Sequence, residues 1–152
     1  MNPLENEQHI AAIAQRFTEV APQNWARLVG NWEATPDGDG PPVLNYLTLA
    51  VVNGGDRWLF GQVGYDEQLY DLVAAYNTAS AGEVTTKEGE TASTRWTVFD
   101  LEVDADGTFR SNLGYDQPKR SNGIMDEESL GRFETYLDTW IAEHGATPGS
   151  SS

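Results

Sequence analysis

Residues 94–115 constrain the fold more than any other part of this 152-residue chain. Their first half alternates between apolar and acidic side chains, as a strand with one buried face does. The apolar face carries Phe99, Leu101 and Val103, and the opposite face carries Asp100, Glu102 and Asp104. In the turn that follows, Gly107 supplies a positive φ. The return strand, residues 108–115, places Phe109, Leu113 and Tyr115 on the buried face. The segment therefore predicts an antiparallel hairpin and a sheet that contains it.

Three more strands are predicted upstream, at residues 25–34, 43–52 and 57–63. The first is the least regular, because Gly30 interrupts it, whereas the second is nearly continuous in apolar residues, as a central strand is. The sequence Asn-Gly-Gly-Asp at 53–56 is a hairpin signal between the second and the third. Residues 79–93 are small, polar and charged, and we expect most of them to form a mobile loop.

Three amphipathic helices complete the pattern. Asn2, Asp66 and Asp126 are the predicted N-caps, and Gly145 ends the last helix. Their apolar stripes are Ile10, Ile13, Ala14, Phe17 and Val20; Leu69, Leu72, Val73 and Tyr76; and Leu130, Phe133, Leu137, Trp140 and Ile141. We expect an α+β fold with a single antiparallel sheet of about five strands, in the order α-β-β-β-α-β-β-α, and helices packed mainly on one face. Residues 1–145 are predicted to form one domain and residues 146–152 a flexible tail.

The charge of the chain limits its partners. It has 24 Asp and Glu against 9 Lys and Arg, a formal net charge of −15, and the acids run from Glu5 to Glu143 among aromatic and aliphatic residues. Nucleic acids and anionic membranes attract basic patches, so we expect neither as a partner. Two interpretations remain: the acids maintain solubility, or they bind a basic protein.

A partner-binding surface is predicted on the acidic face of the hairpin. By alternation Trp96 shares this face, and an exposed tryptophan among acids suits an interface anchor. The predicted contact residues are Trp96, Asp100, Glu102, Asp104 and Asp116, with Asp37 and Asp39 in the loop 35–42 as an extension. Gly-Tyr-Asp occurs twice, at 64–66 and 114–116, which either local capping rules or a shared binding role explains.

The sequence offers little chemistry for catalysis. Residues 102–107 imitate the first half of a calcium-binding EF-hand loop, but Leu113 stands where that loop needs a bidentate Glu. The two histidines lack a second ligand at metal-binding spacing, and there is no cysteine and no Gly-x-Ser-x-Gly nucleophile motif. We expect no catalytic residue, metal or cofactor. A small carboxylate-based hydrolase or calcium-binding module, and an acidic scaffold subunit, remain as alternatives.

The sequence VDADGTFRSNLGYD at 103–116, placed after a Trp-bearing strand, resembles the YezG-like immunity proteins. The resemblance extends upstream to Pro-Gln-Asn-Trp at 22–25 and Leu-Tyr-Asp-Leu at 69–72, and it covers residues 5–144 mainly as a pattern. Residues 83–93 and the loop near Asp37 depart from it. The resemblance implies a non-enzymatic cytoplasmic protein that neutralises a secreted or contact-delivered bacterial toxin, of nuclease or NAD-degrading type, with a basic active-site cleft. We expect the free protein to be a monomer.

Overall fold

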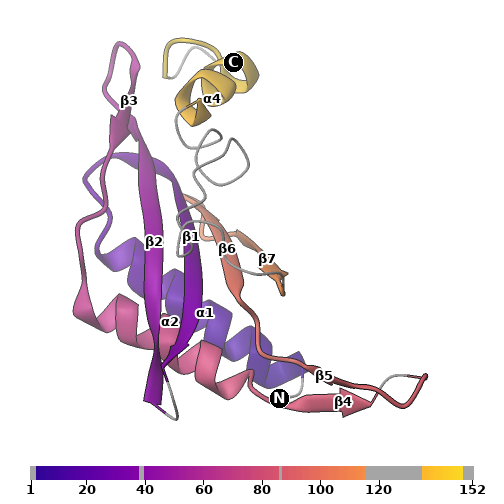
Figure 1. Ribbon diagram of the computed structural model, residues 1–152. Helices are drawn as coiled ribbons and strands as arrows, with labels where there is room; N and C mark the ends of the chain where they lie inside the picture. Colours follow the sequence, from indigo (N-terminus) through magenta and orange to yellow (C-terminus); the bar gives the residue numbers. More distant parts are fainter. Residues whose placement is uncertain (1–2, 38–39, 86, 116–134, 149–152) are drawn as a thin grey trace.

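The computed structural model describes residues 3–37, 40–85, 87–115 and 135–148 (Figure 1). Its elements are α1 (Pro3–Glu19), β1 (Trp25–Asp37), β2 (Gly40–Asn53), β3 (Trp58–Gly61), α2 (Glu67–Ala79), β4 (Glu83–Thr85), β5 (Thr91–Ser93), β6 (Val98–Asp104), β7 (Phe109–Gly114) and α4 (Tyr136–His144). The α+β class, the five-stranded antiparallel sheet and the order of its elements are confirmed. Among the described helices, none combines the length and the hydropathy that crossing a membrane requires.

The strand order in the main sheet is β3-β2-β1-β6-β7, and every neighbouring pair is antiparallel. The central strand β1 pairs with β2 along almost its whole length and with β6 from Arg27 to Glu33. It therefore joins two hairpins, β2–β3 on one side and β6–β7 on the other. Because each residue of β1 between Arg27 and Glu33 has a neighbour on both sides, this stretch is where side chains from three strands meet.

Helices α1 and α2 lie together across one face of the sheet (Figure 1). The stripe predicted for α1 is confirmed, because Ile10, Ile13, Ala14 and Phe17 are all buried. Aromatic rings form the centre of this core: Trp32 contacts Phe17 and Phe99 with ring centroids 5.7 and 5.5 Å apart, and Tyr76 contacts Phe99 at 5.3 Å. Each such side chain contributes about 1.5 to 3 kcal/mol when fully buried, so this face supplies most of the driving force for folding.

Helix α4 packs on the opposite face of the sheet. Trp140 is buried there against Val29, Leu49 and Val51, which alternate along their strands with residues of the main core. The predicted end of the helix at Gly145 is confirmed, and this glycine has a φ of 86°. The predicted N-cap Asp126 and the stripe residues Leu130 and Phe133 lie outside the described residues.

Gly30, which made β1 the least regular strand of the sequence, has a packing explanation. The indole of Trp32, two residues further on the same face, lies over Gly30, and a Cβ built on Gly30 would be 2.2 Å from the Cη2 atom of Trp32. A glycine inside a strand commonly marks such a close approach. The small residue therefore allows Trp32 to lie flat against its own strand, in contact with Phe17 and Phe99.

Residues 79–93, expected to be mostly loop, contain the two-stranded ribbon β4–β5. The ribbon projects away from the main sheet (Figure 1), and Gly89 adopts a φ of 82° in the turn between its strands. Its base is fixed, because Thr94 donates from its backbone N to the Gly82 carbonyl at 3.0 Å and from Oγ1 to the Ser80 carbonyl at 2.8 Å. Strands of three residues are too short to produce a recognisable alternation in sequence.

The buried face predicted for the return strand β7 is only partly correct. Leu113 packs against the core, but Phe109 is 38% exposed and Tyr115 is 56% exposed. The strand is the last one in the order of the sheet, beyond the strands that α1 and α2 cover. Alternation assigned Phe109 and Leu113 to the correct face, but it does not indicate whether anything covers that face. Tyr115 lies beyond the end of β7.

We predict that Gly30→Ala lowers the free energy of unfolding by about 1 to 3 kcal/mol, because the new methyl group must displace the Trp32 indole from the core. Urea unfolding measures the change. Gly64→Ala is the matched control, since nothing lies within 4 Å of its Cβ position, and it should change stability by less than about 0.5 kcal/mol. Equal stability of the two variants would contradict the packing of Trp32 over Gly30.

Candidate functional site

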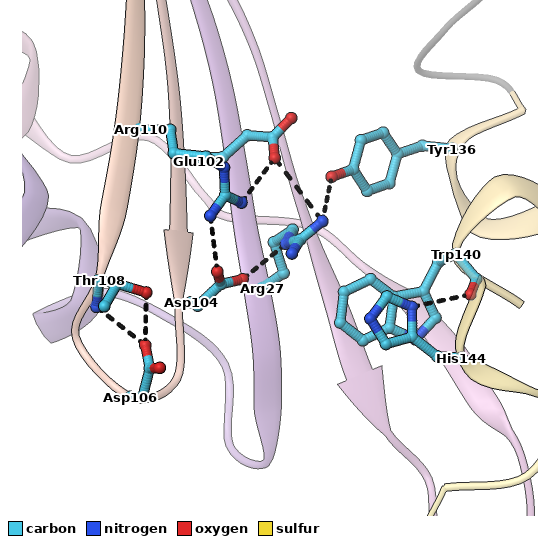
Figure 2. Close-up of polar contacts among 9 residues, drawn as sticks. All are labelled: Arg27, Glu102, Asp104, Asp106, Thr108, Arg110, Tyr136, Trp140 and His144. Atoms are coloured by element: carbon cyan, nitrogen blue, oxygen red, sulfur yellow. Dashed lines mark hydrogen bonds and ion pairs between the residues drawn. The ribbon is translucent and has the colours of Figure 1, made fainter. Parts of the chain in front are cut away.

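The hairpin β6–β7 has the turn that its sequence predicts. Asp104 and Thr108 close it through a hydrogen bond from the Asp104 backbone N to the Thr108 carbonyl at 2.8 Å, and Gly107 has a φ of 92°. Asp106 accepts hydrogen bonds from the Thr108 backbone N at 2.9 Å and from Thr108 Oγ1 at 2.6 Å (Figure 2). These bonds from Thr108 lower the pKa of Asp106. Asp106 is therefore part of the turn itself.

The predicted division of β6 into two faces is confirmed. Phe99, Leu101 and Val103 are at most 1% exposed, and Asp100, Glu102 and Asp104 lie on the opposite face, each partly exposed. The acids are not free, however. Asn31 Nδ2 donates to Asp100 Oδ1 at 2.7 Å, and the other two carboxylates bind arginines.

Glu102, Asp104, Arg27 and Arg110 form an ion-pair network (Figure 2). Arg27 Nε donates to Asp104 Oδ1 at 2.6 Å, and Arg110 Nη1 donates to Asp104 Oδ2 at 2.9 Å. Glu102 Oε2 accepts from Arg110 Nη2 at 3.0 Å and lies 3.7 Å from Arg27 Nη1. Two acids and two arginines sum to zero charge, so this part of the sheet does not contribute to the net charge of the chain.

The strand register creates the network. Arg27 on β1 is directly opposite Asp104 on β6, and Glu102 on β6 is directly opposite Arg110 on β7. Opposite charges in such cross-strand positions are close enough to pair. The network follows from the hairpin turn and the pairing of β1, because a shift of one residue would move Arg27 to the other face of the sheet.

The network changes the ionisation of its members. Partial burial alone would raise the pKa of Asp104, but the hydrogen bonds from Arg27 and Arg110 outweigh it and hold this pKa below its ordinary value. Burial alone would lower the pKa of Arg27, but its hydrogen bonds to Asp104 and Tyr136 outweigh this effect and raise the pKa above its ordinary value. Both groups are therefore fully charged at neutral pH.

Arg27 also connects the sheet to α4. Its guanidinium carbon lies 4.9 Å from the centroid of the Trp140 ring, and its Nη1 donates to the Tyr136 hydroxyl at 3.4 Å. Trp58 packs edge-on against Trp140 at 5.1 Å and donates from Nε1 to the Gly145 carbonyl at 3.0 Å. His144 stacks on Trp140 at 3.8 Å (Figure 2). One arginine thus contacts both an acidic strand and the aromatic face of a helix.

A hollow of about 260 Å³ lies between the network and α4; it is lined by Arg27, Glu102, Tyr136, Thr139, Trp140 and Glu143. Its chemistry is that of a hydrogen-bond acceptor site, since Arg27 is already engaged and the two glutamates are acceptors. The Thr139 hydroxyl donates to the Thr135 carbonyl at 3.2 Å, so the lining residues hold no nucleophile paired with a base. Within the described parts of the chain, no three His, Cys, Asp or Glu side chains converge as metal ligands.

The prediction for Trp96 is wrong. Its side chain is 1% exposed and packs in the main core, with ring centroids 5.5 Å from Tyr76 and 5.6 Å from Phe99. Strand β6 begins only at Val98, and the preceding residues are held to the end of α2: Asn77 Nδ2 donates to the Trp96 carbonyl at 2.6 Å. Alternation therefore does not extend back to residue 96, and Trp96 is not an interface anchor.

Of the remaining predicted contact residues, the structure describes Asp37, which lies far from the network. Asp37 is exposed at the opposite end of β1 from Arg27, ten residues away, which is about 30 Å along a strand. Asp39 and Asp116 lie outside the described residues. Among the predicted contact residues that the structure describes, Asp100, Glu102 and Asp104 are the ones that lie together.

Sequence reasoning did not find Arg27, Tyr136 or Glu143. Arg27 is in phase with Val29 on the face that α4 covers, and this alternation would have identified it had Gly30 not obscured the strand pattern. Tyr136 precedes the predicted stripe residue Trp140 by one helical turn. Comparison of the chain with protein-family models and with curated proteins found no match.

We predict that Asp104→Asn lowers the free energy of unfolding at pH 7 by about 1 to 2 kcal/mol, because two arginine hydrogen bonds lose their charged acceptor. Since the folded-state pKa of Asp104 is lowered, its contribution is complete above the unfolded-chain value of about 3.9 and is lost as the pH falls through the folded value. The difference between variant and wild type should therefore shrink below about pH 4.

Urea unfolding at several pH values between 7 and 3 measures this. Asp56→Asn, at an exposed turn position, is the matched control and should change stability little at any pH. If Asp104→Asn costs no more than Asp56→Asn at pH 7, the ion-pair network does not stabilise the fold.

Proposed function

We propose that this protein is a cytoplasmic immunity protein of bacteria, without enzymatic activity, which binds a secreted or contact-delivered toxin and inhibits it through an acidic surface. The toxin classes follow from the resemblance of residues 103–116 to YezG-like immunity proteins: a nuclease or an NAD-degrading enzyme. The partner is a folded toxin domain with a basic active-site cleft.

The observation that supports the proposal is that the few basic residues of the chain are mostly occupied by partners within the protein. Four of the six described Lys and Arg residues hold partners within the protein: Arg16, Arg27 and Arg110 in ion pairs, and Arg95 in a hydrogen bond to Asn77. If every one of the nine cations of the chain took one acid, fifteen acids would remain without a cation. The surface of the protein therefore carries a strong negative field.

Most of the described acids are exposed on the surface of the protein. Exposed acids occur on α1, α2, α4, the end of β1 and several turns: Glu5, Glu7, Glu19, Asp37, Asp56, Glu67, Asp71, Glu88, Glu90, Asp106, Asp138 and Glu143. Like charges in a compact state repel each other and lower its stability. A basic partner explains why so large an excess is tolerated, since steering by complementary charge accelerates association.

A nuclease toxin fits this surface well. Its active site must attract phosphates, so it is basic, and an acidic protein that occupies it prevents substrate binding. The ion-pair network is the less suitable part of the surface for this role, because Glu102 and Asp104 already bind two arginines, one of which contacts α4. Charge reversal at these two residues would disturb folding together with binding.

We predict that the toxin domain encoded beside this gene forms a stable complex with the protein, and that coexpression restores growth to cells that produce the toxin. The association rate constant should fall about tenfold or more when sodium chloride is raised from about 50 to 500 mM, because salt screens steering, whereas the dissociation rate should change much less. Stopped-flow measurements with an inactive toxin variant test this, with sucrose at matched viscosity as the control. No complex and no rescue of growth would rule out the proposed function and leave the acidic scaffold interpretation.

A further inference from the structure

Tyr65 is the most exposed large hydrophobic residue in the part of the chain that the structure describes, at 66%. It belongs to the first Gly-Tyr-Asp tripeptide, between β3 and α2. Asp66 follows the capping rule, because its Oδ2 accepts a hydrogen bond from the Leu69 backbone N at 2.8 Å. The capping rule does not explain why the tyrosine beside it is mostly exposed. A single exposed aromatic ring is ordinary; what distinguishes Tyr65 is the set of groups that lie around it.

The position of Tyr65 is well fixed. The next residue, Asp66, accepts two hydrogen bonds from Arg16 on α1, from Nε at 2.9 Å and from Nη2 at 2.8 Å, in addition to capping α2. The ring of Tyr65 lies against those of Tyr70 and Tyr46, with centroids 6.0 and 6.5 Å away. Tyr70 is in turn anchored, because its hydroxyl accepts from the Leu44 backbone N at 3.0 Å. A ring held in this way loses little freedom when it binds a partner.

Two carboxylates act on this ring. Glu67 and Asp71 are exposed and one turn apart on α2. Partial burial raises the pKa of Tyr65, and the charges of Glu67 and Asp71 raise it further, so both carboxylates place the phenol in a negative field. We call Tyr65, Glu67 and Asp71, with the supporting rings of Tyr46 and Tyr70, the Tyr65 surface.

The neighbouring cation does not neutralise this surface. A hollow of about 500 Å³ adjoins it, lined by Arg16, Asp66, Glu67, Gln68, Asp71 and Leu72. Arg16 is paired with Asp66 through two hydrogen bonds, which leaves the charges of Glu67 and Asp71 directed at solvent in the same hollow. The hollow is shallow and open to solvent, and its three acids against one arginine favour a cationic side chain.

We propose that the Tyr65 surface is the docking point for an arginine side chain of a protein partner. The guanidinium plane stacks on the Tyr65 ring, and its N–H groups donate to Glu67 and Asp71 at the edge of the hollow. Arginine fits better than lysine, because it combines stacking with several directed donors. A second copy of this chain is disfavoured as the occupant, since it presents the same excess of acids. The inference rests on the proposed function only in taking the partner to be a basic protein.

The test uses a peptide probe, so that it does not depend on the toxin. The ¹⁵N-labelled protein is titrated with acetyl-Gly-Arg-Gly-Arg-Gly-amide and, in parallel, with the same peptide carrying citrulline in place of arginine. We predict that the arginine peptide shifts amide resonances of residues 64–71, and that the citrulline peptide, which has the same shape but no charge, does not. Tyr65→Ala should weaken binding about two- to fivefold, whereas Tyr65→Phe, which keeps the ring, should bind like the wild type.

A charge control separates local docking from general attraction. Glu67→Gln with Asp71→Asn should weaken binding of the arginine peptide at least as much as Tyr65→Ala. Glu7→Gln with Asp56→Asn removes two exposed acids elsewhere and should have little effect. Equal losses from the two double variants, shifts spread over the whole surface, or equal binding of the citrulline peptide would each overturn the docking point. A protein that still rescues cells from the toxin in that case keeps the proposed function and loses only this contact.

Discussion

The pairing of Arg27 with Asp104 is the interaction on which the arrangement of this fold most depends. Arg27 lies on the central strand, under α4, where an unpaired charge would be costly. Asp104 and the Tyr136 hydroxyl bind its guanidinium, and the Trp140 ring covers it. Because the same arginine touches β6 and α4, the hairpin and the helix cannot be placed independently. The face that α4 covers is thus an ionic centre beside an apolar patch, whereas the α1–α2 face is an aromatic core.

Three of the few basic residues, all arginines, lie where secondary-structure elements meet. Arg16 ties α1 to the start of α2, Arg27 ties the sheet to α4, and Arg110 ties β7 to β6. Each removes charge at a place where two elements meet, and Arg16 also lies 3.8 Å from Glu19 on the exterior of α1, but three arginines cannot offset the excess of acids. The resulting repulsion lowers stability, and burial of the aromatic core has to offset it. Such an arrangement is reasonable if the surface charge has a use of its own.

The sequence predicted what depends on local periodicity and missed what depends on how far a pattern extends. The faces of β6 followed from alternation, and the turn at Gly107 fixed their register. Trp96 was assigned to the exposed face by mistake, because strand β6 begins only at Val98 and a hydrogen bond from Asn77 on α2 holds the backbone before it. Phe109 was expected to be buried, because alternation assigns a face but does not show whether another element covers it, and Tyr115 was expected to be buried although β7 ends at Gly114. The stripe of α4 shows that the helix buries one side, but not which face of the sheet receives it.

The position of an acid in the fold explains why the acids of β6, which the sequence assigned to a binding surface, have partners within the protein. A residue on an inner strand has cross-strand neighbours about 5 Å away on two sides, so an acid there is usually close to a partner. Asp100 and Asp104 both follow this rule, with Asn31 and two arginines. An acid on a helix exterior has neighbours only one turn away, and Glu67 has Asp71 there, which cannot neutralise it. In a chain with this excess of acids, unmatched charge therefore collects on helix exteriors, and the proposed arginine contact lies where the fold fixes the Tyr65 ring beside two such acids.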